Sequence, residues 1–256
     1  MRTVPITGIC LLMLSMSCCM GHPAPLMPVS DLVIERLNNN YLPLDSCEVT
    51  TDGNTIRYRF IAKDCMCSSG ALIICTDCGF GDVTVNGREV KAVKGLHQLG
   101  PGDGCYFLDD RLQSGENVVE LQRSPMSGDA EVPAMYVAGD FSVEQASGGM
   151  WNLQPAKVLD LGSWGGQGLP FYTWEVSYSR SYVFPEKAGK RILRLGEWKG
   201  SACEVYVNWE KAGVISKKPY IMNIGPFLKP GQNEIEVRCI GNGDSDCGLY
   251  EEFTIE

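Results

Sequence analysis

The sequence predicts an all-β protein built as two tandem β-sandwiches. Three observations carry the all-β, two-domain part: short apolar runs alternate with polar residues, turn residues separate these runs, and one order of runs and turns occurs twice. The chain has 256 residues, with 29 glycines and 14 prolines, which favours many turns and short elements over long helices. This length suits two domains of about 110–120 residues each.

Short β-like runs follow one another along the chain after its first thirty residues. In one of them, Ile56, Tyr58 and Phe60 fall on one face of the predicted strand, and Arg57 and Arg59 fall on the other. We find no sustained apolar stripe at helical spacing. The runs predicted as strands are 31–37, 55–60, 71–75, 83–85, 117–121, 181–184, 191–195, 203–207 and 233–238.

A hairpin turn is predicted twice. Asn86 and Gly87 follow one strand, and Asn208 and Trp209 follow another strand 122 residues later. Asn and Gly tolerate positive φ, so the pair favours a tight turn between two strands. Trp209 stands where the first copy has glycine, so the second copy departs from the pattern at this position.

A second repeated segment follows each hairpin. Residues 112–121 carry Leu-x-x-Gly-x-Asn before an alternating strand, and residues 228–237 carry the same order 116 residues later. The pattern predicts a turn into the last core strand, with the leucine held inside. The near-equal offsets and the shared order predict two homologous domains, over residues 30–146 and 150–256.

Segment 205–238, VYVN…AG…KPY…IGPFLKPGQNEIEVR, resembles the sugar-binding jelly-roll domain of family-2 glycoside hydrolases and their galactose-binding-like relatives. Segments 42–49, 135–144 and 161–184 resemble the tandem sandwich region of rhamnosidase-like bacterial glycosidases. Together the resemblances cover roughly residues 31–256. They imply two tandem galactose-binding-like jelly rolls, similar to the non-catalytic accessory region of a large bacterial glycoside hydrolase.

The function that this resemblance implies is carbohydrate binding. Sugars stack their C–H faces on aromatic rings and take hydrogen bonds from amide and charged side chains. Trp164 lies in a Gly-rich loop, where we expect it to be exposed, whereas Phe171, Tyr178 and Tyr182 are expected in the sandwich core. The residues predicted to bind carbohydrate are Trp164, Gln167, Tyr172, Trp198 and Trp209.

No catalytic residue is predicted. A glycosidase needs two carboxylates flanking the scissile bond, and in enzymes of this type a separate domain usually presents them. Two alternatives stay open: a hydrolase of O-glycosyl bonds, as part of a split or truncated glycosidase, and a structural or adhesion protein without sugar affinity. The acids considered are Asp109, Asp110, Asp140, Glu175, Glu197 and Glu204, all expected at the surface, with Asp140 as a structural acceptor at the domain junction.

The formal net charge of −9 argues against nucleic acid as a partner, because phosphate binding needs a surplus of Lys and Arg. The expected partners are a plant or host glycan and a catalytic glycosidase chain. No cofactor or metal is predicted, and structural calcium is left open. Segment 242–248 places oxygen ligands at alternate positions, but it lacks the bidentate Glu of an EF-hand loop and favours an ordinary polar turn.

Residues 1–23 resemble a signal or lipoprotein-like leader, with Arg2 before an apolar stretch and small residues before Cys18. The prediction is a secreted or cell-surface protein that does not span the membrane, since no later stretch has 18 consecutive apolar residues.

The twelve cysteines leave a cytoplasmic alternative open. Three lie in the predicted leader, and the other nine are an odd number that cannot all pair within the chain. Disulfides, free thiols and a zinc site are all considered for a local cluster, Cys65, Cys67, Cys75 and Cys78.

Overall fold

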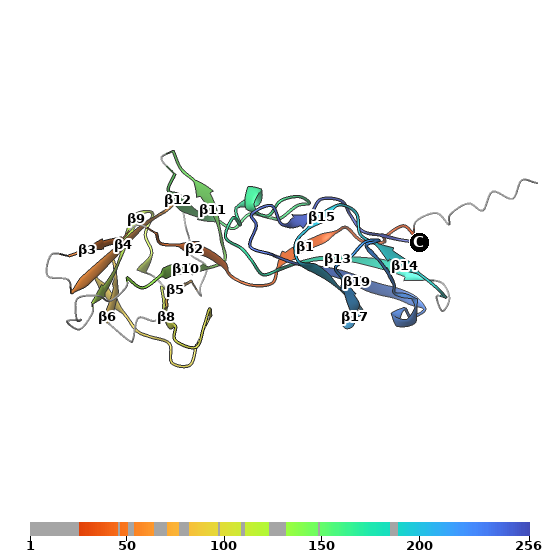
Figure 1. The fold of residues 1–256 in the computed structure, drawn as a ribbon, viewed down its shortest axis with the longest axis horizontal. Coiled ribbons are helices and arrows are strands. Elements are labelled where there is room, and N and C mark those ends of the chain that lie inside the picture. The colour runs from red at the N-terminus through yellow and green to blue at the C-terminus, as the bar shows by residue number, and fades with distance from the viewer. Residues whose placement is uncertain are drawn as a thin grey trace, which may run out of the picture.

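The fold is all-β in the computed structural model, as predicted (Figure 1). Short 3-10 turns such as η2 (Gly165–Gln167) and η3 (Gly225–Phe227) lie between the strands. No helix in the described part of the chain is long and apolar enough to cross a membrane. The structure describes residues 26–45, 47–50, 54–63, 71–76, 82–96, 98–108, 111–122, 132–147, 149–184 and 189–256. The predicted leader 1–23, Cys65, Cys67, Cys78, Asp109 and Asp110 lie outside these residues.

Two sheets enclose the first hydrophobic core. Strands of both sheets contribute to it, among them Val137 from one sheet and Tyr58 from the other. The four-stranded sheet runs β2 (Asn40–Pro43), β10 (Met135–Gly139), β5 (Leu72–Cys75), β8 (Gly104–Phe107). The larger sheet runs β11 (Phe141–Gln145), β12 (Trp151–Pro155), β4 (Thr55–Ala62), β9 (Gly115–Gln122), β6 (Asp82–Val85), β7 (Arg88–Val90), with β3 (Cys47–Val49) also paired to β4.

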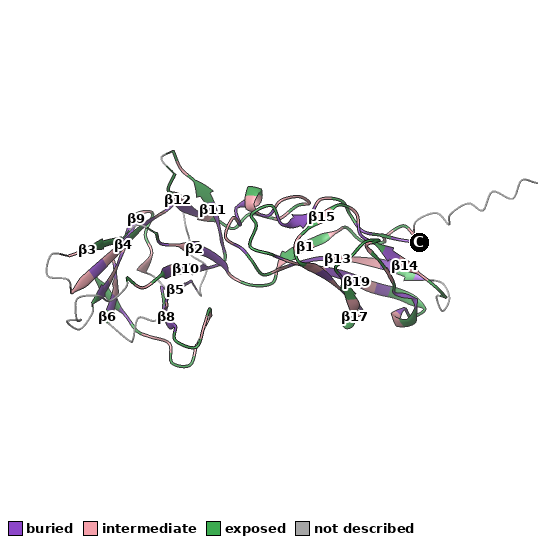
Figure 2. Cartoon of the chain, viewed as in Figure 1, coloured by how far each residue is buried: buried purple, intermediate pink, exposed green. Residues whose placement is uncertain are grey.

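A second hydrophobic core fills the other half of the molecule, and buried residues recur along its strands (Figure 2). The main sheet runs β1 (Val33–Arg36), β13 (Glu175–Phe184), β19 (Gly231–Ile240), β16 (Ala202–Val207), β17 (Glu210–Ile215). Smaller sheets are formed by β18 (Ile221–Asn223), β14 (Ile192–Arg194) and β21 (Thr254–Ile255), and by β15 (Trp198–Lys199) with β20 (Gly248–Leu249).

Alternation along the strands explains which side chains form these cores. Ile56, Tyr58 and Phe60 of β4 are buried, as the sequence pattern predicts, and so are Ile235 and Val237 of β19. A two-residue period places such side chains on one face of a strand, and burial of that face holds the sandwich together.

Strand pairing crosses the predicted domain limits at two places. Strand β1 pairs with β13 of the second core, although the sequence places residues 30–146 in the first sandwich. Strand β12 pairs with β4 and β11 of the first core, although the sequence places residues 150–256 in the second. Each half therefore includes one strand that the sequence repeat assigns to the other.

Both predicted hairpin turns have positive φ at their two central residues. Asn86 and Gly87 have φ of 51° and 74°, and Asn208 and Trp209 have φ of 50° and 70°. Trp209 thus takes a left-handed conformation that glycine adopts without cost and a bulky side chain rarely does. The missing glycine does not change the turn, but it places a tryptophan at the tip of the β16–β17 hairpin.

The repeated asparagines make the same hydrogen bonds in each half. The Asn233 amide donates to the carbonyls of Lys229 and Gly231, and its oxygen accepts from Lys229 N and Asn208 Nδ2. Asn117 makes the equivalent four bonds, with Gln113, Gly115 and Asn86 as partners.

Candidate functional site

Trp164 is buried, so the exposed position expected from its Gly-rich loop is wrong. Only 1% of the residue is exposed, and its indole N–H donates to the Tyr178 hydroxyl at 2.8 Å. The glycines serve close packing of two backbones: a Cβ on Gly165 would lie 2.3 Å from the Ser245 carbonyl oxygen. The loop is thereby pressed against residues 245–249, and Trp164 belongs to the core.

Gln167 and Tyr172 also hold the fold together. The Gln167 amide donates to the carbonyls of Asp160 and Ser163, and its oxygen accepts from Asp160 N. The buried Tyr172 hydroxyl donates to the Glu175 carbonyl and accepts from Asn38 N. Both side chains use their polar groups within the protein.

We expect Tyr172 to make stability fall at high pH. Burial is the main cause that raises its pKa from 10.0 to about 12. The folded state therefore holds the hydroxyl proton more tightly than the unfolded state does, and this contribution is present below pH 10 and lost as the pH rises towards 12. Urea unfolding at several pH values would measure the slope, and Tyr172→Phe should flatten it. An unchanged slope in that variant would contradict the assignment.

The two remaining predicted residues, Trp198 and Trp209, differ in exposure. Trp198 is half-buried and packs edge-to-face on Tyr220, with ring centroids 5.4 Å apart. Trp209 is 74% exposed at the hairpin tip. Of the five predicted residues, Trp164 and Tyr172 contact each other in the core, with ring centroids 5.9 Å apart, and Trp209 alone presents a largely free ring to solvent.

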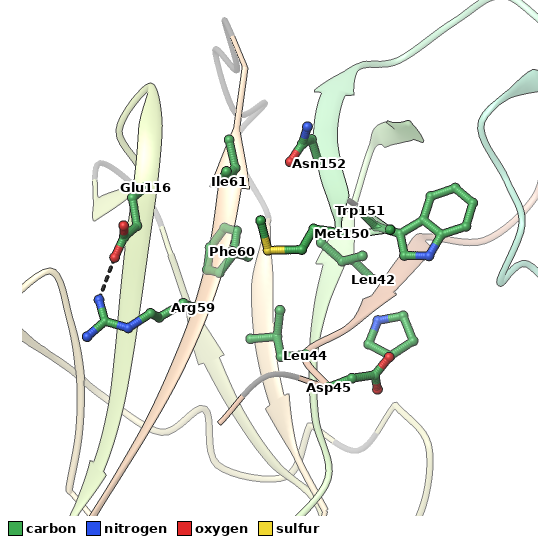
Figure 3. A pocket seen from close by; sticks show the side chains of 12 residues that line it. Leu42, Leu44, Asp45, Arg59, Phe60, Ile61, Glu116, Met150, Trp151 and Asn152 are labelled. Carbon is green, nitrogen blue, oxygen red and sulfur yellow. Dashed lines mark hydrogen bonds and ion pairs between the residues drawn. The ribbon is translucent and has the colours of Figure 1, made fainter. Parts of the chain in front are cut away.

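A hollow instead opens in the first half, beside an interruption in the pairing of β4 (Figure 3). Strand β3 pairs with β4 up to Tyr58, and β12 pairs with β4 from Ile61 onward. Among the described residues, neither β3 nor β12 pairs with Arg59 or Phe60, so the pairing along this edge of β4 is interrupted there. The hollow has a volume of about 280 Å³ and is lined by residues 42–45, 59–61, 116 and 149–152.

The floor of this hollow is apolar. Leu42, Leu44 and Phe60 belong to the first core and also line the hollow. Met150 is 57% exposed, and its side chain extends toward Phe60 in Figure 3. Trp151 adds a half-buried indole. An apolar, partly aromatic floor of this kind suits the C–H face of a sugar ring.

The indole of Trp151 is held in place by a second aromatic ring. Its ring packs edge-to-face on Phe171, with centroids 5.2 Å apart and an angle of 76° between the planes. Such a pair fixes the orientation of both rings. The indole is therefore positioned before any ligand arrives.

Charged groups surround the floor. Arg59 forms an ion pair with Glu116 and lies 3.8 Å from Glu48, while Asp45 lines the hollow from the segment after β2. Carboxylates accept hydrogen bonds from hydroxyls, and a guanidinium donates them. The rim can therefore bind polar groups above the apolar floor.

Asn152 is the one lining residue with an unsatisfied buried atom among those described. It is 2% exposed, and its Oδ1 accepts no hydrogen bond from the described residues. A buried polar atom without a partner costs about 1–3 kcal/mol. A hydroxyl that reaches this oxygen, after a small movement of the side chains that cover it, would remove this cost.

Three of the acidic residues considered from the sequence have side-chain partners, and Glu197 is exposed. Asp140 accepts from Arg36, Glu175 accepts from Asn38, and the pKa of Glu204 is lowered chiefly by its hydrogen bond from Lys211. None of these three lines the hollow.

The polar loop 242–248 satisfies its own oxygens. Asn242 and Asp244 bond each other, and Asp246 forms an ion pair with Lys199 at 2.6 Å. Within the described ranges, no group of three or more His, Cys, Asp or Glu side chains is arranged to hold a metal ion.

The hollow could not be predicted from the sequence because its residues come from four separated segments. Residues 149–152 fall at the limit between the two predicted domains. The signal that could have found them is the pair Trp151-Asn152 beside the exposed Met150, at the start of an alternating strand.

No family model and no curated protein matches this chain. Among solved structures, a rhamnosidase from Novosphingobium sp. PP1Y is 14% identical with a TM-score of 0.33, over 85% of this chain and 24% of that chain. An α-L-rhamnosidase from Streptomyces avermitilis is 14% identical with a TM-score of 0.29, over 84% and 24%. A lectin from Pleurotus ostreatus is 14% identical with a TM-score of 0.25, over 87% and 80%. The chain spans about a quarter of each rhamnosidase, and scores this low assign it to no family.

Proposed function

We propose that this protein binds carbohydrate in the hollow between β2, β4 and β12. The observation that carries the proposal is a hollow whose lining combines Phe60 and Trp151 with Asn152, a residue that has an unsatisfied buried oxygen. Sugars combine apolar C–H faces with hydroxyl donors, and this pairing matches the floor and rim. Binding here requires no catalytic group, in keeping with an accessory role beside a glycosidase chain.

The charge of the rim supports a neutral sugar as the ligand. Asp45 and Glu116 carry two negative charges, and Arg59 carries one positive charge that Glu116 already pairs. A uronic acid would add a further carboxylate to this excess, and like charges repel. Neutral glycans are therefore expected to bind better than acidic ones.

The first experiment is a glycan array on the full chain, covering plant and animal glycans, with and without calcium. The strongest neutral glycan is then titrated by calorimetry. We expect Asn152→Leu to weaken binding of this glycan at least tenfold, because leucine has a similar volume and accepts no hydroxyl proton. Stability should stay equal or rise, since the variant removes an unsatisfied buried oxygen.

A matched pair of arginines provides the control. Arg57 and Arg59 extend from the same face of β4, but only Arg59 lines the hollow. Arg59→Gln is expected to weaken binding, and Arg57→Gln is expected to leave it unchanged. Equal effects of the two variants, or no bound glycan on the array, would refute carbohydrate binding at this site. Hydrolysis of aryl glycosides that is lost in Asp45→Asn would replace binding by catalysis as the function.

A further inference from the structure

Two cysteines lie side by side on neighbouring strands of the main sheet of the second half. Cys203 of β16 and Cys239 of β19 are direct partners in the antiparallel register, and their sulfurs lie 2.9 Å apart. Both residues are fully buried in the second core. The two thiols are in direct contact, and either sulfur can donate a hydrogen bond to the other.

The backbone at this pair already suits a covalent bond. Directly opposed residues of antiparallel strands have Cα atoms about 4.5–5.5 Å apart, and disulfides span Cα distances of about 4.4–6.8 Å. The next pair on the same face, Val205 and Val237, keeps the same register. Joining the two sulfurs therefore needs rotation of side chains and no change of strand pairing.

The other described cysteine of this half has a different environment. Cys247 is buried, and its thiol donates to the Asn242 side-chain oxygen at 2.8 Å. Desolvation by burial raises the pKa of this thiol as well as that of Cys203. Cys247 is thus a buried thiol with an oxygen partner, and it serves as an internal control.

We propose that Cys203 and Cys239 form an intrachain disulfide when the chain folds in the presence of a small-molecule disulfide such as oxidised glutathione. The Cys203 thiolate attacks a sulfur of oxidised glutathione and releases one glutathione thiolate. The Cys239 thiolate then attacks the Cys203 sulfur of the mixed disulfide and releases the second. Both cysteine protons pass to the two glutathione thiolates, so two thiols are oxidised and one disulfide is reduced.

The exchange must take place before the core closes. The thiolate is the attacking species, and burial in the folded state raises the pKa of the Cys203 thiol and keeps it protonated. Oxidised glutathione also has no access to a fully buried sulfur. A chain folded under reducing conditions should therefore stay reduced, whereas a chain refolded with oxidised glutathione should carry the bond.

The test is peptide mapping of the full chain after refolding from urea, with or without a mixture of oxidised and reduced glutathione. Free thiols are alkylated in denaturant, and the protein is cleaved with trypsin without reduction. Cys203 falls in peptide 200–211, and Cys239 and Cys247 fall together in peptide 239–256. The expected product is a linked pair of these peptides, two hydrogen atoms lighter than their sum, and only in the oxidised sample.

Two variants identify the sulfur that takes part. Cys247→Ser should keep the linked pair, and Cys239→Ser should abolish it. Full alkylation of Cys203 in the oxidised wild-type chain would overturn the proposal, and so would a linked pair that persists in Cys239→Ser. Should Cys239→Ser fail to fold, Cys247→Ser alone decides, because its peptide 239–256 contains one cysteine.

Discussion

Replacing Trp164 with alanine is expected to lower the free energy of unfolding by about 3–5 kcal/mol. The indole is 1% exposed, so its loss leaves a large cavity in the second core. It also removes the hydrogen bond to the Tyr178 hydroxyl, which additionally accepts from Leu249 N. Urea unfolding followed by circular dichroism would measure the change.

Trp209→Ala is the matched control for this prediction. Its ring is 74% exposed, and its φ of 70° is a left-handed conformation that most residues other than glycine avoid. We expect a change within about 0.5 kcal/mol, as for other surface substitutions. Similar losses in the two variants would contradict the assignment of Trp164 to the core. Any loss of glycan binding in Trp164→Ala should follow from unfolding and disappear under conditions where the variant is folded.

Asn233→Ala and Asn117→Ala are each expected to cost about 3 kcal/mol or more. Both asparagines are fully buried and make four hydrogen bonds with the turn before their strand and with the hairpin asparagine. Alanine leaves several of these backbone groups without a partner, at about 1–3 kcal/mol for each that stays buried. Thermal unfolding by calorimetry would compare the two variants directly.

Gln232→Ala provides the control next to Asn233. Gln232 is exposed and makes one side-chain bond, to the Ser181 hydroxyl at 3.2 Å, so little change is expected. A small effect of Asn233→Ala, equal to that of Gln232→Ala, would show that the turn does not depend on the buried amide. A large effect in one half only would show that the two asparagines are not energetically equivalent.

Local patterns made the strands and the turns predictable. Alternation in β4 and β19 depends on residues two apart, and the turns at Asn86 and Asn208 depend on adjacent residues. The left-handed φ of Trp209 shows that the turn survives without its glycine. Period and turn chemistry are both readable from a short window of sequence.

The burial of Trp164 and the hollow could not be predicted in this way, because distant segments create them. Trp164 is covered by residues 245–249, which approach closely only because Gly165 and Gly248 have no side chains. The hollow depends on where β3 and β12 stop along β4. Neither contact can be recognised in the local sequence pattern. Export, the identity of the glycan and the partner chain stay predictions from the sequence.

The three residues between β1 and β2 carry the chain from the second half of the molecule to the first. Strand β1 ends at Arg36 in the sheet of the second core, and β2 starts at Asn40 in a sheet of the first. A cut at residue 150 would remove β1 from β13 and β12 from β4. The domain limits predicted from the sequence are therefore offset by one strand from the units that close in space, and a self-contained fragment of either half needs one strand from beyond the predicted limit.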